Sequence, residues 1–253
     1  MSNILNLLVE KQTALWRMKR QLEDLRQRPG RCLENDVAYG PCLLVSRQRG
    51  SGGGAIACLV GERLGWHLFN KGLIDEIRKL PQLQKQLLES VDEATRGKWE
   101  ETFHHEPKPG DRGFDDYLRD LRRLVLTLGH QGDVIVVGRG AQYILPAACA
   151  LRVRVVAPAA VRLRRMIDAD KLSPAAAQAE LEKSDRDREA FVQHGFQRDS
   201  GSPLEYDLVI NTEHVTYEAA AGIVRQALHE KLGVALEKTA ATVQQRAAEA
   251  RWE

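Results

Sequence analysis

The sequence predicts a three-layer α/β fold with a parallel sheet, and three features indicate it. Short apolar runs alternate with longer segments whose apolar residues recur every three or four positions. The run Val134–Val137 is apolar enough to be a central strand covered on both faces. A glycine-rich turn at residues 50–54 separates the first apolar run from the helix after it. A chain of 253 residues has room for one such domain with extensions.

The expected elements alternate along the chain. Strands are predicted at 42–45, 66–69, 133–137, 151–156 and 206–211. Helices are predicted to begin near 55, 73 and 158, and to span 115–130, 174–181, 217–232 and 234–252. A dense charge cluster at 183–188 is typical of a solvated helix face, or of a mobile basic lid over phosphates.

The N-terminal residues form a separate pattern. Apolar residues between Ile4 and Leu25 alternate in steps of four and three, with Lys11 as the only break, in a heptad seam of about three repeats. A helix docked on its own domain and a homodimerisation helix both fit this seam. Pro29-Gly30 ends it, and residues 31–40 are expected to be a linker. The predicted division is therefore 1–40 for the helix and linker, 41–233 for the α/β domain and 234–253 for a C-terminal helix.

Composition narrows the class of protein. The chain is 43% hydrophobic and 28% charged, as in a globular protein, and its formal charge of +2 does not indicate a nucleic-acid partner. No apolar run approaches the ~20 residues of a membrane span, and the N-terminus has no signal-peptide pattern. We therefore expect a cytoplasmic protein without a membrane partner.

The cysteines show no metal or disulfide pattern. The four of them, Cys32, Cys42, Cys58 and Cys149, include no Cys-x-x-Cys pair and have no nearby histidine at zinc spacing. Buried free thiols are the prediction for all of them.

The glycine turn predicts an anion site. Successive N–H groups of Gly50, Ser51, Gly52, Gly53 and Gly54 can form a concave nest at the positive end of the following helix. The usual phosphate-binding loop continues with a lysine and a hydroxyl residue. This chain has Gly53 at the lysine position and Ala55 at the hydroxyl position.

A second candidate group follows the central strand. Arg139 stands between two glycines just past the predicted strand 133–137, where open α/β sheets bind their ligands. It is expected at the same edge of the sheet as the glycine turn. The alternative is a tight turn with a solvated arginine.

Several motifs occur together in the order and spacing of one family. They are Ser46-Arg47-Gln48 before Gly50-Ser51-Gly52-Gly53, then Val137-Gly138-Arg139-Gly140-Ala141, Asp185 with Arg188, and Tyr206-Asp207-Leu208-Val209-Ile210-Asn211-Thr212. This combination, over roughly residues 41–232, resembles the cytidylate kinase-like family, a divergent branch of the P-loop nucleoside monophosphate kinases.

The resemblance implies a P-loop nucleoside triphosphate hydrolase fold with a five-stranded parallel sheet, ATP with Mg²⁺ as phosphoryl donor, and CMP or a similar nucleotide as acceptor. The glycine turn would bind the donor phosphates, and Arg139 would bind the acceptor phosphate. Arg188 would belong to a closing lid that Asp185 orients. Arg47 would lie beside the loop, in a role that the resemblance does not fix.

The chain also departs from the family pattern. Relatives commonly carry Arg-Glu where Gly54-Ala55 stand, an acid where Asn70 stands, and an aspartate where Val137 stands. The magnesium ligand is therefore unassigned. Two functions remain open: a kinase in which Arg47 and Arg49 replace the missing charge, and a pseudokinase that binds nucleotides or protein partners.

Overall fold

The computed structural model describes residues 32–34, 37–79 and 112–236, together with residues 89, 91, 95–97 and 99. Its centre is a five-stranded sheet in the order β4-β5-β3-β6-β7, in which every pairing is parallel. The strands are β3 (Cys42–Arg47), β4 (His67–Phe69), β5 (Val134–Val137), β6 (Ala150–Val156) and β7 (Leu208–Asn211). The predicted parallel α/β sheet is confirmed.

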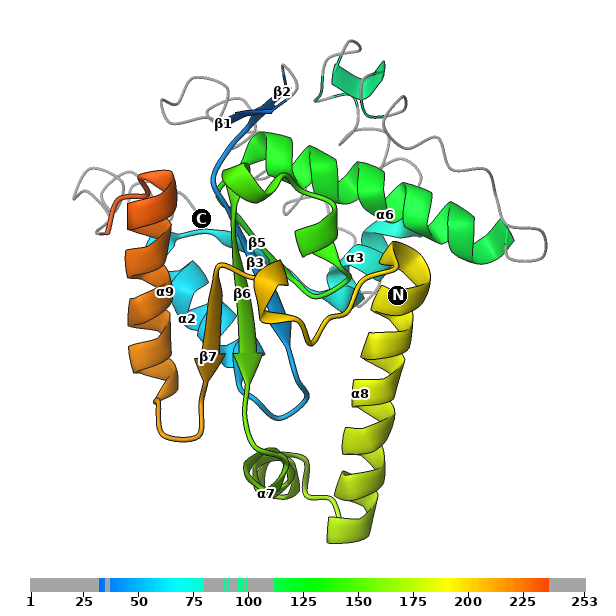
Figure 1. The fold of residues 1–253 in the computed structure, drawn as a ribbon, viewed down its shortest axis with the longest axis vertical. Helices are drawn as coiled ribbons and strands as arrows, with labels where there is room; N and C mark the ends of the chain where they lie inside the picture. Colours follow the sequence, from blue (N-terminus) through cyan, green and yellow to red (C-terminus); the bar gives the residue numbers. More distant parts are fainter. Residues whose placement is uncertain are drawn as a thin grey trace, which may run out of the picture.

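Helices cover both faces of this sheet (Figure 1). They are α2 (Gly53–Leu64), α3 (Lys71–Arg78), α6 (Arg112–Gln131), α7 (Ala159–Asp170), α8 (Pro174–Phe196) and α9 (Tyr217–Leu232). Short 3₁₀ turns lie at η1 (Ala141–Tyr143), η2 (Ala147–Cys149) and η3 (Pro203–Glu205).

Alternation along the central strand β3 divides the core in two. Leu43 and Val45 share one cluster with Ile56 of α2 and Leu228 of α9. The intervening Leu44 belongs to the other cluster, with side chains of α3 and α6. Because successive strand residues point to opposite faces, an apolar run such as β3 fits a strand buried on both sides.

The strand register brings the two predicted site segments to one edge of the sheet. Val45 of β3 is paired with Val137 of β5 and Val153 of β6. The glycine turn after β3 and Arg139 after β5 therefore leave the sheet at the same edge, as predicted.

Helix α8 is longer than expected. The predicted helix at 174–181 continues without a break through the charge cluster to Phe196. It packs on α7 through a small cluster of Met166, Ala177 and Leu181. Most of the charged side chains lie on exposed or half-buried positions, so they do not interrupt the helix.

The expectation of a linker at residues 31–40 is wrong for most of that segment. Strands β1 (Cys32–Glu34) and β2 (Val37–Tyr39) form an antiparallel hairpin. Val37 and Tyr39 lie two positions apart and are both buried in the core. The Tyr39 hydroxyl accepts a 3.0 Å hydrogen bond from Nε1 of Trp99.

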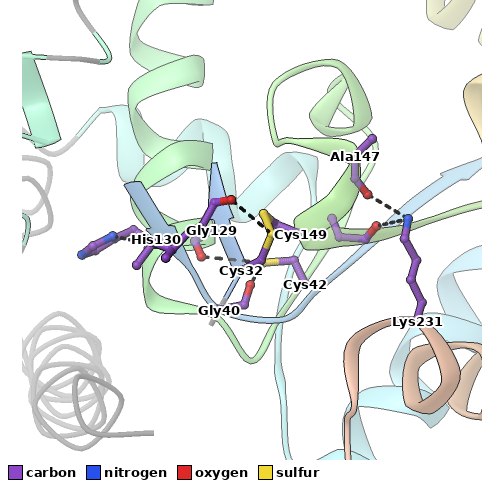
Figure 2. The surroundings of a disulfide bond; sticks show 11 residues. Cys32, Gly40, Cys42, Gly129, His130, Ala147, Cys149 and Lys231 are labelled. Atoms are coloured by element: carbon purple, nitrogen blue, oxygen red, sulfur yellow. Dashed lines mark hydrogen bonds between the residues drawn. A yellow bond between two sulfur atoms is a disulfide. The ribbon is translucent and has the colours of Figure 1, made fainter. Parts of the chain in front are cut away.

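The prediction of a buried free thiol is confirmed for Cys42 and is wrong for the other three cysteines. Cys32 and Cys149 form a disulfide, with their Cα atoms 5.3 Å apart (Figure 2). Cys42 beside them is a buried free thiol, and Cys58 is a free thiol on the exposed side of α2. The two bonded cysteines are 117 positions apart, so only the docking of β1 against η2 brings them together.

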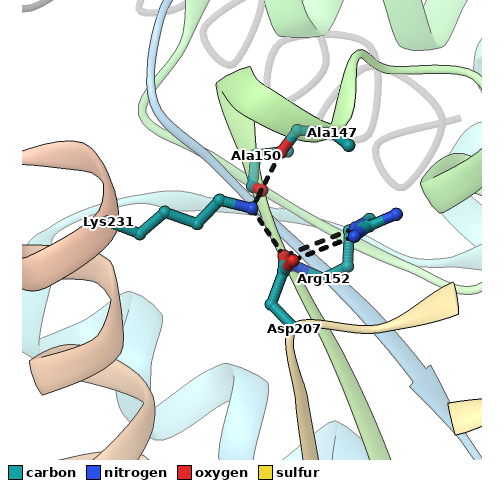
Figure 3. Close-up of polar contacts among 5 residues, drawn as sticks. All are labelled: Ala147, Ala150, Arg152, Asp207 and Lys231. Carbon is teal, nitrogen blue, oxygen red and sulfur yellow. Dashed lines mark hydrogen bonds and ion pairs between the residues drawn. The ribbon is translucent and has the colours of Figure 1, made fainter. Parts of the chain in front are cut away.

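At the other edge of the sheet from the glycine turn, Asp207, which directly precedes β7, connects β6 and α9 (Figure 3). Its carboxylate accepts hydrogen bonds from Nη2 of Arg152 at 2.9 Å and from Nζ of Lys231 at 2.7 Å. Lys231 also donates to the carbonyl oxygens of Ala147 and Ala150. Burial acts to raise the pKa of Asp207, but these donors together hold it below its ordinary value.

The expected heptad helix at 1–28 lies outside the described residues, and so does nearly all of the expected helix at 234–252. No helix in the described part of the chain is both long and apolar enough to cross a membrane.

Candidate functional site

The glycine turn has the backbone shape of an anion nest. Gly50 and Gly52 have φ values of 75° and 84°, in the left-handed region that glycine adopts without strain. Helix α2 begins at Gly53, so the first N–H groups of α2 have no partner within the helix. Those N–H groups and the positive end of the helix dipole favour an anion at this position.

The carbonyl side of the turn is held by polar side chains. Arg162 donates to the carbonyl oxygen of Arg49 at 3.3 Å. Thr212 donates to the carbonyl oxygen of Ser51 at 2.7 Å. Arg165 binds the Thr212 hydroxyl and lies 3.5 Å from the Gly50 carbonyl oxygen. The Arg162 side chain of α7 is buried against this loop.

Ser51 shapes the turn from within. Its side chain is buried, and its Oγ donates to the carbonyl oxygen of Gln48 at 2.9 Å. Its backbone N–H bonds to the same carbonyl oxygen at 3.3 Å. Both donors of Ser51 are thus already engaged in the turn.

Close packing explains several of the glycines. A Cβ on Gly52 would overlap the ring of Tyr217, and one on Gly50 would lie 2.7 Å from the carbonyl oxygen of Arg162. A Cβ on Gly54 would meet nothing within 4 Å, and Gly54 is exposed. The start of α2 is therefore packed from behind and open at Gly54.

A cavity of about 290 Å³ lies at this edge of the sheet. The ends of β3, β5 and β6, helix α8 and the loop at 199–201 line it. Its cationic side chains are Arg47, Arg139, Arg154 and Arg188, and its carboxylates are Asp185, Glu189 and Asp199. The structure thus brings Arg47, Arg139, Asp185 and Arg188 together, while the glycines of the turn do not line the cavity.

Arg139 is fixed from several sides. Its Nη2 donates to Oδ2 of Asp75 at 2.6 Å. Its guanidinium carbon lies 5.3 Å from the ring centre of Tyr117 and 5.2 Å from that of Phe191. The buried Nε of Arg139 has no hydrogen-bond partner. This planar cation is therefore held in place with donor capacity left over, as anion recognition requires. A solvated arginine in a turn, the alternative weighed from the sequence, is excluded.

Arg47 is a cation surrounded by other cations. Its guanidinium makes no hydrogen bond or ion pair with any residue that the structure describes. Burial lowers the pKa of Arg47 to about 10, and the neighbouring Arg188, Arg139 and Arg49 add to the effect. An anion bound in the cavity would offset both the cost of burying the Arg47 charge and its repulsion by the neighbouring arginines.

Arg188 and Asp185 connect the cavity to the helices α7 and α8. Nη1 of Arg188 lies 3.4 Å from the carbonyl oxygen of Arg47, and burial lowers the pKa of Arg188 although Asp185 opposes this. Asp185 of α8 pairs with Arg162 of α7 at 2.7 Å. Because Arg162 also holds the glycine turn, this pair couples the helix hairpin to the loop.

Sequence reasoning did not find Asp75, Arg154 or the aromatic pair around Arg139. Asp75 lies in α3, five residues after Asn70, and nothing in its local sequence marks a contact with Arg139. Asn70 itself caps α3, since its side chain accepts a 3.0 Å bond from the N–H of Leu73. Arg154 donates to the hydroxyls of Ser46 and Tyr206.

Phosphate and metal fit these residues differently. The open amides of α2, the Arg47 guanidinium, which bonds to no described residue, and the unpartnered Nε of Arg139 suit phosphate oxygens. By contrast, no three His, Cys, Asp or Glu side chains among the described residues gather to hold a metal ion. Asp185, a carboxylate beside the cavity, is already paired with Arg162. The described residues therefore do not fit a protein cage for Mg²⁺.

The parallel sheet with a left-handed glycine turn between β3 and α2 is the P-loop fold expected from the sequence. Residues 44–214, more than half of the chain, match the cytidylate kinase-like family. The chain belongs to this family, and the resemblance noted in its sequence is confirmed.

One solved structure shares this fold, and a second aligns more weakly. An uncharacterized protein from Eubacterium ventriosum aligns with a TM-score of 0.59 at 17% identity, over 75% of this chain and 98% of that one. A shikimate kinase from Acinetobacter baumannii, solved with shikimate, aligns with a TM-score of 0.44 at 16% identity, over 76% of this chain and 96% of that one.

A sequence relative adds a partial match. A uronate isomerase from Corynebacterium glutamicum is 33% identical over 106 residues, which are 42% of this chain. The match spans only 20% of the length of that isomerase.

Proposed function

We propose that this protein is an ATP-dependent nucleoside monophosphate kinase acting on a pyrimidine nucleotide such as CMP. The observation that carries the proposal is the convergence of Arg47, Arg139 and Arg188 on one cavity beside the glycine turn. The family to which residues 44–214 belong supports the same reaction class. Phosphoryl transfer needs positioned cations more than a covalent catalyst, and this cavity supplies cations.

In the proposed reaction, a phosphate oxygen of the nucleoside monophosphate attacks the γ-phosphorus of ATP. The bond from that phosphorus to the β–γ bridging oxygen breaks, and ADP leaves with the electron pair. With a dianionic acceptor no proton is released. The glycine turn would bind the donor phosphates through the N–H groups of Gly50, Gly52, Gly53 and Gly54, while Ser51, whose donors bond to Gln48, would hold the turn in shape. Arg139 would hold the acceptor phosphate, and Arg188, oriented through Asp185, would close over the reacting groups.

Mg²⁺ belongs to the proposal only with the nucleotide. Kinase sites usually hold it through substrate phosphates and water, with one or two carboxylates. No step above depends on a particular magnesium ligand.

The test is ADP formation in a coupled assay with a panel of nucleoside monophosphates. Arg139→Ala is expected to raise the KM for the acceptor and to lower kcat by about 100-fold, because it removes a charged anion contact. Arg63→Ala is the matched control, since Arg63 on α2 bonds to the carbonyl oxygen of Glu218 away from the cavity. Wild-type kinetics for Arg139→Ala would exclude the assignment.

The second candidate is a pseudokinase that binds nucleotides or a protein partner. It is favoured by the small residues Gly53, Gly54 and Ala55 where reactive groups usually stand, and by Asn70, which serves as a helix cap. Thermal stabilisation by nucleotides without any monophosphate-dependent ADP formation would select it.

We also propose an α/β domain at 41–233 to which the β1–β2 hairpin belongs, with an N-terminal helix before it and a C-terminal helix at 234–253. We further propose a cytoplasmic location and a homodimer formed through the N-terminal helix. Disulfides are rare in the reducing cytosol, so Cys32 and Cys149 would be expected as thiols there. Alkylation in intact cells, followed by mass spectrometry, measures whether Cys32 and Cys149 are thiols or a disulfide there. Alkylated Cys32 and Cys149 would support the cytoplasmic location, and an intact disulfide would contradict it. Light scattering with and without residues 1–28 tests the dimer.

A further inference from the structure

Arg47 stands at the position of the first glycine in the phosphate-loop pattern. That pattern is Gly-x-x-x-x-Gly-Lys, and the lysine reaches the β- and γ-phosphates. With Gly52 as its second glycine, the lysine position falls on Gly53 and the first glycine falls on Arg47. The chain therefore has glycine where the pattern has its cation, and a cation where the pattern has glycine.

The structure shows that these two positions compete for one space. A Cβ built on Gly53 would lie 2.5 Å from Cβ of Arg47 and 3.2 Å from its Cγ. It would also lie 3.2 Å from Cβ of Val155 on β6. A lysine at position 53 and an arginine at position 47 cannot both fit this backbone.

Arg47 lies near both of the proposed phosphate-binding arginines, Arg139 and Arg188. Its Nη1 lies against Gly138, where a Cβ would overlap it, directly before Arg139. Arg188 contacts the backbone carbonyl oxygen of Arg47. Arg49, the other candidate for the missing charge, instead pairs with Asp170 at 2.7 Å on the surface.

We propose that Arg47 is the cation that contacts the transferring phosphoryl group, in place of the lysine that this loop lacks. The inference rests on the proposed kinase function. The cation has moved from the start of α2 to the end of β3, and it approaches the phosphates from the side of Arg139. Its planar fork can bind two phosphate oxygens at once, where a lysine offers a point charge.

The first test compares Arg47→Met with Arg49→Met in the full-length protein. Methionine keeps an apolar stem and removes the charge. For Arg47→Met we expect kcat to fall about 100-fold, and we expect most of the thermal stabilisation by inorganic tripolyphosphate to be lost. The melting temperature without ligand should not fall, because the change removes a half-buried cation that has no ion-pair partner among the described residues. Arg49→Met should change each quantity far less.

A purely structural role for Arg47 predicts the opposite pattern. Its removal would lower the melting temperature of the unliganded protein and leave the tripolyphosphate effect intact. That result, or a kcat equal to that of Arg49→Met, overturns the proposal. Arg47→Lys gives an independent reading, since it should keep part of the tripolyphosphate effect while kcat remains low.

The second test exchanges the two positions. Gly53→Lys alone should be destabilised by the overlap with Arg47, and Arg47→Gly alone should lose turnover. The double variant Arg47→Gly/Gly53→Lys restores the usual loop pattern and should be more active than either single variant. A double variant no more active than Arg47→Gly contradicts the exchange.

The role of Arg47 and the kinase assignment can fail separately. If the wild-type protein forms ADP and Arg47→Met does so equally well, the kinase stands and the role of Arg47 fails. If the wild-type protein forms no ADP with any nucleoside monophosphate, the kinase assignment fails, and the role of Arg47 in transfer fails with it.

Discussion

Replacing Cys32 and Cys149 together by serine removes the covalent tie between the β1–β2 hairpin and η2. The bond closes a loop of 117 residues. A loop of that length restricts the unfolded chain by about 5 kcal/mol in the loop-entropy description, and measured effects are usually about 2–4 kcal/mol. We therefore expect the free energy of unfolding to fall by about 2–4 kcal/mol.

Urea unfolding of the oxidised wild-type protein and the double-serine variant measures this difference. Cys58→Ser is the control, because Cys58 is an exposed free thiol and its replacement should leave the urea midpoint unchanged. Alkylation in denaturant without reductant supplies a direct check: only Cys42 and Cys58 should react. Reaction of Cys32 and Cys149 as well, or an unchanged midpoint in the double variant, would refute the argument.

Two further predictions concern the glycine turn and Asp207. Gly52→Ala should destabilise the fold by about 1–2 kcal/mol from its left-handed backbone alone, and by more from overlap with Tyr217. Gly54→Ala, which meets nothing, should be neutral or stabilising by up to about 1 kcal/mol in the same thermal melts. Lys231→Met should cost about 1–2 kcal/mol at neutral pH. Because the native pKa of Asp207 is lowered, its contribution is present above the unfolded value of about 3.9 and lost as pH falls through the native pKa. The variant should therefore lose less stability than the wild-type protein between neutral pH and pH ~3, and an identical pH dependence would show that Lys231 does not hold this pKa down.

Local signals explain what the sequence could predict. The glycine turn and Arg139 each follow an apolar strand directly, and parallel strands carry such segments to one edge. Asp75 and the disulfide could not be predicted in this way, because their partners lie far away in the chain. Arg162 resembles any basic helix residue in sequence, and only the packing of α7 against the loop buries it.

The charge arrangement in the cavity bears on the choice between kinase and pseudokinase. Arg47 is half-buried, its guanidinium makes no hydrogen bond or ion pair with any described residue, and Arg139 and Arg188 lie close enough to lower its pKa. Like charges gathered in a partly buried cavity reduce the stability of the protein without ligand. A protein that used the fold only as a scaffold would gain nothing from this cost, whereas an anion bound by all of these side chains would offset it. The loss of the loop lysine at Gly53 is therefore better explained as a relocation of the phosphate-binding cation to Arg47 than as a loss of phosphate binding.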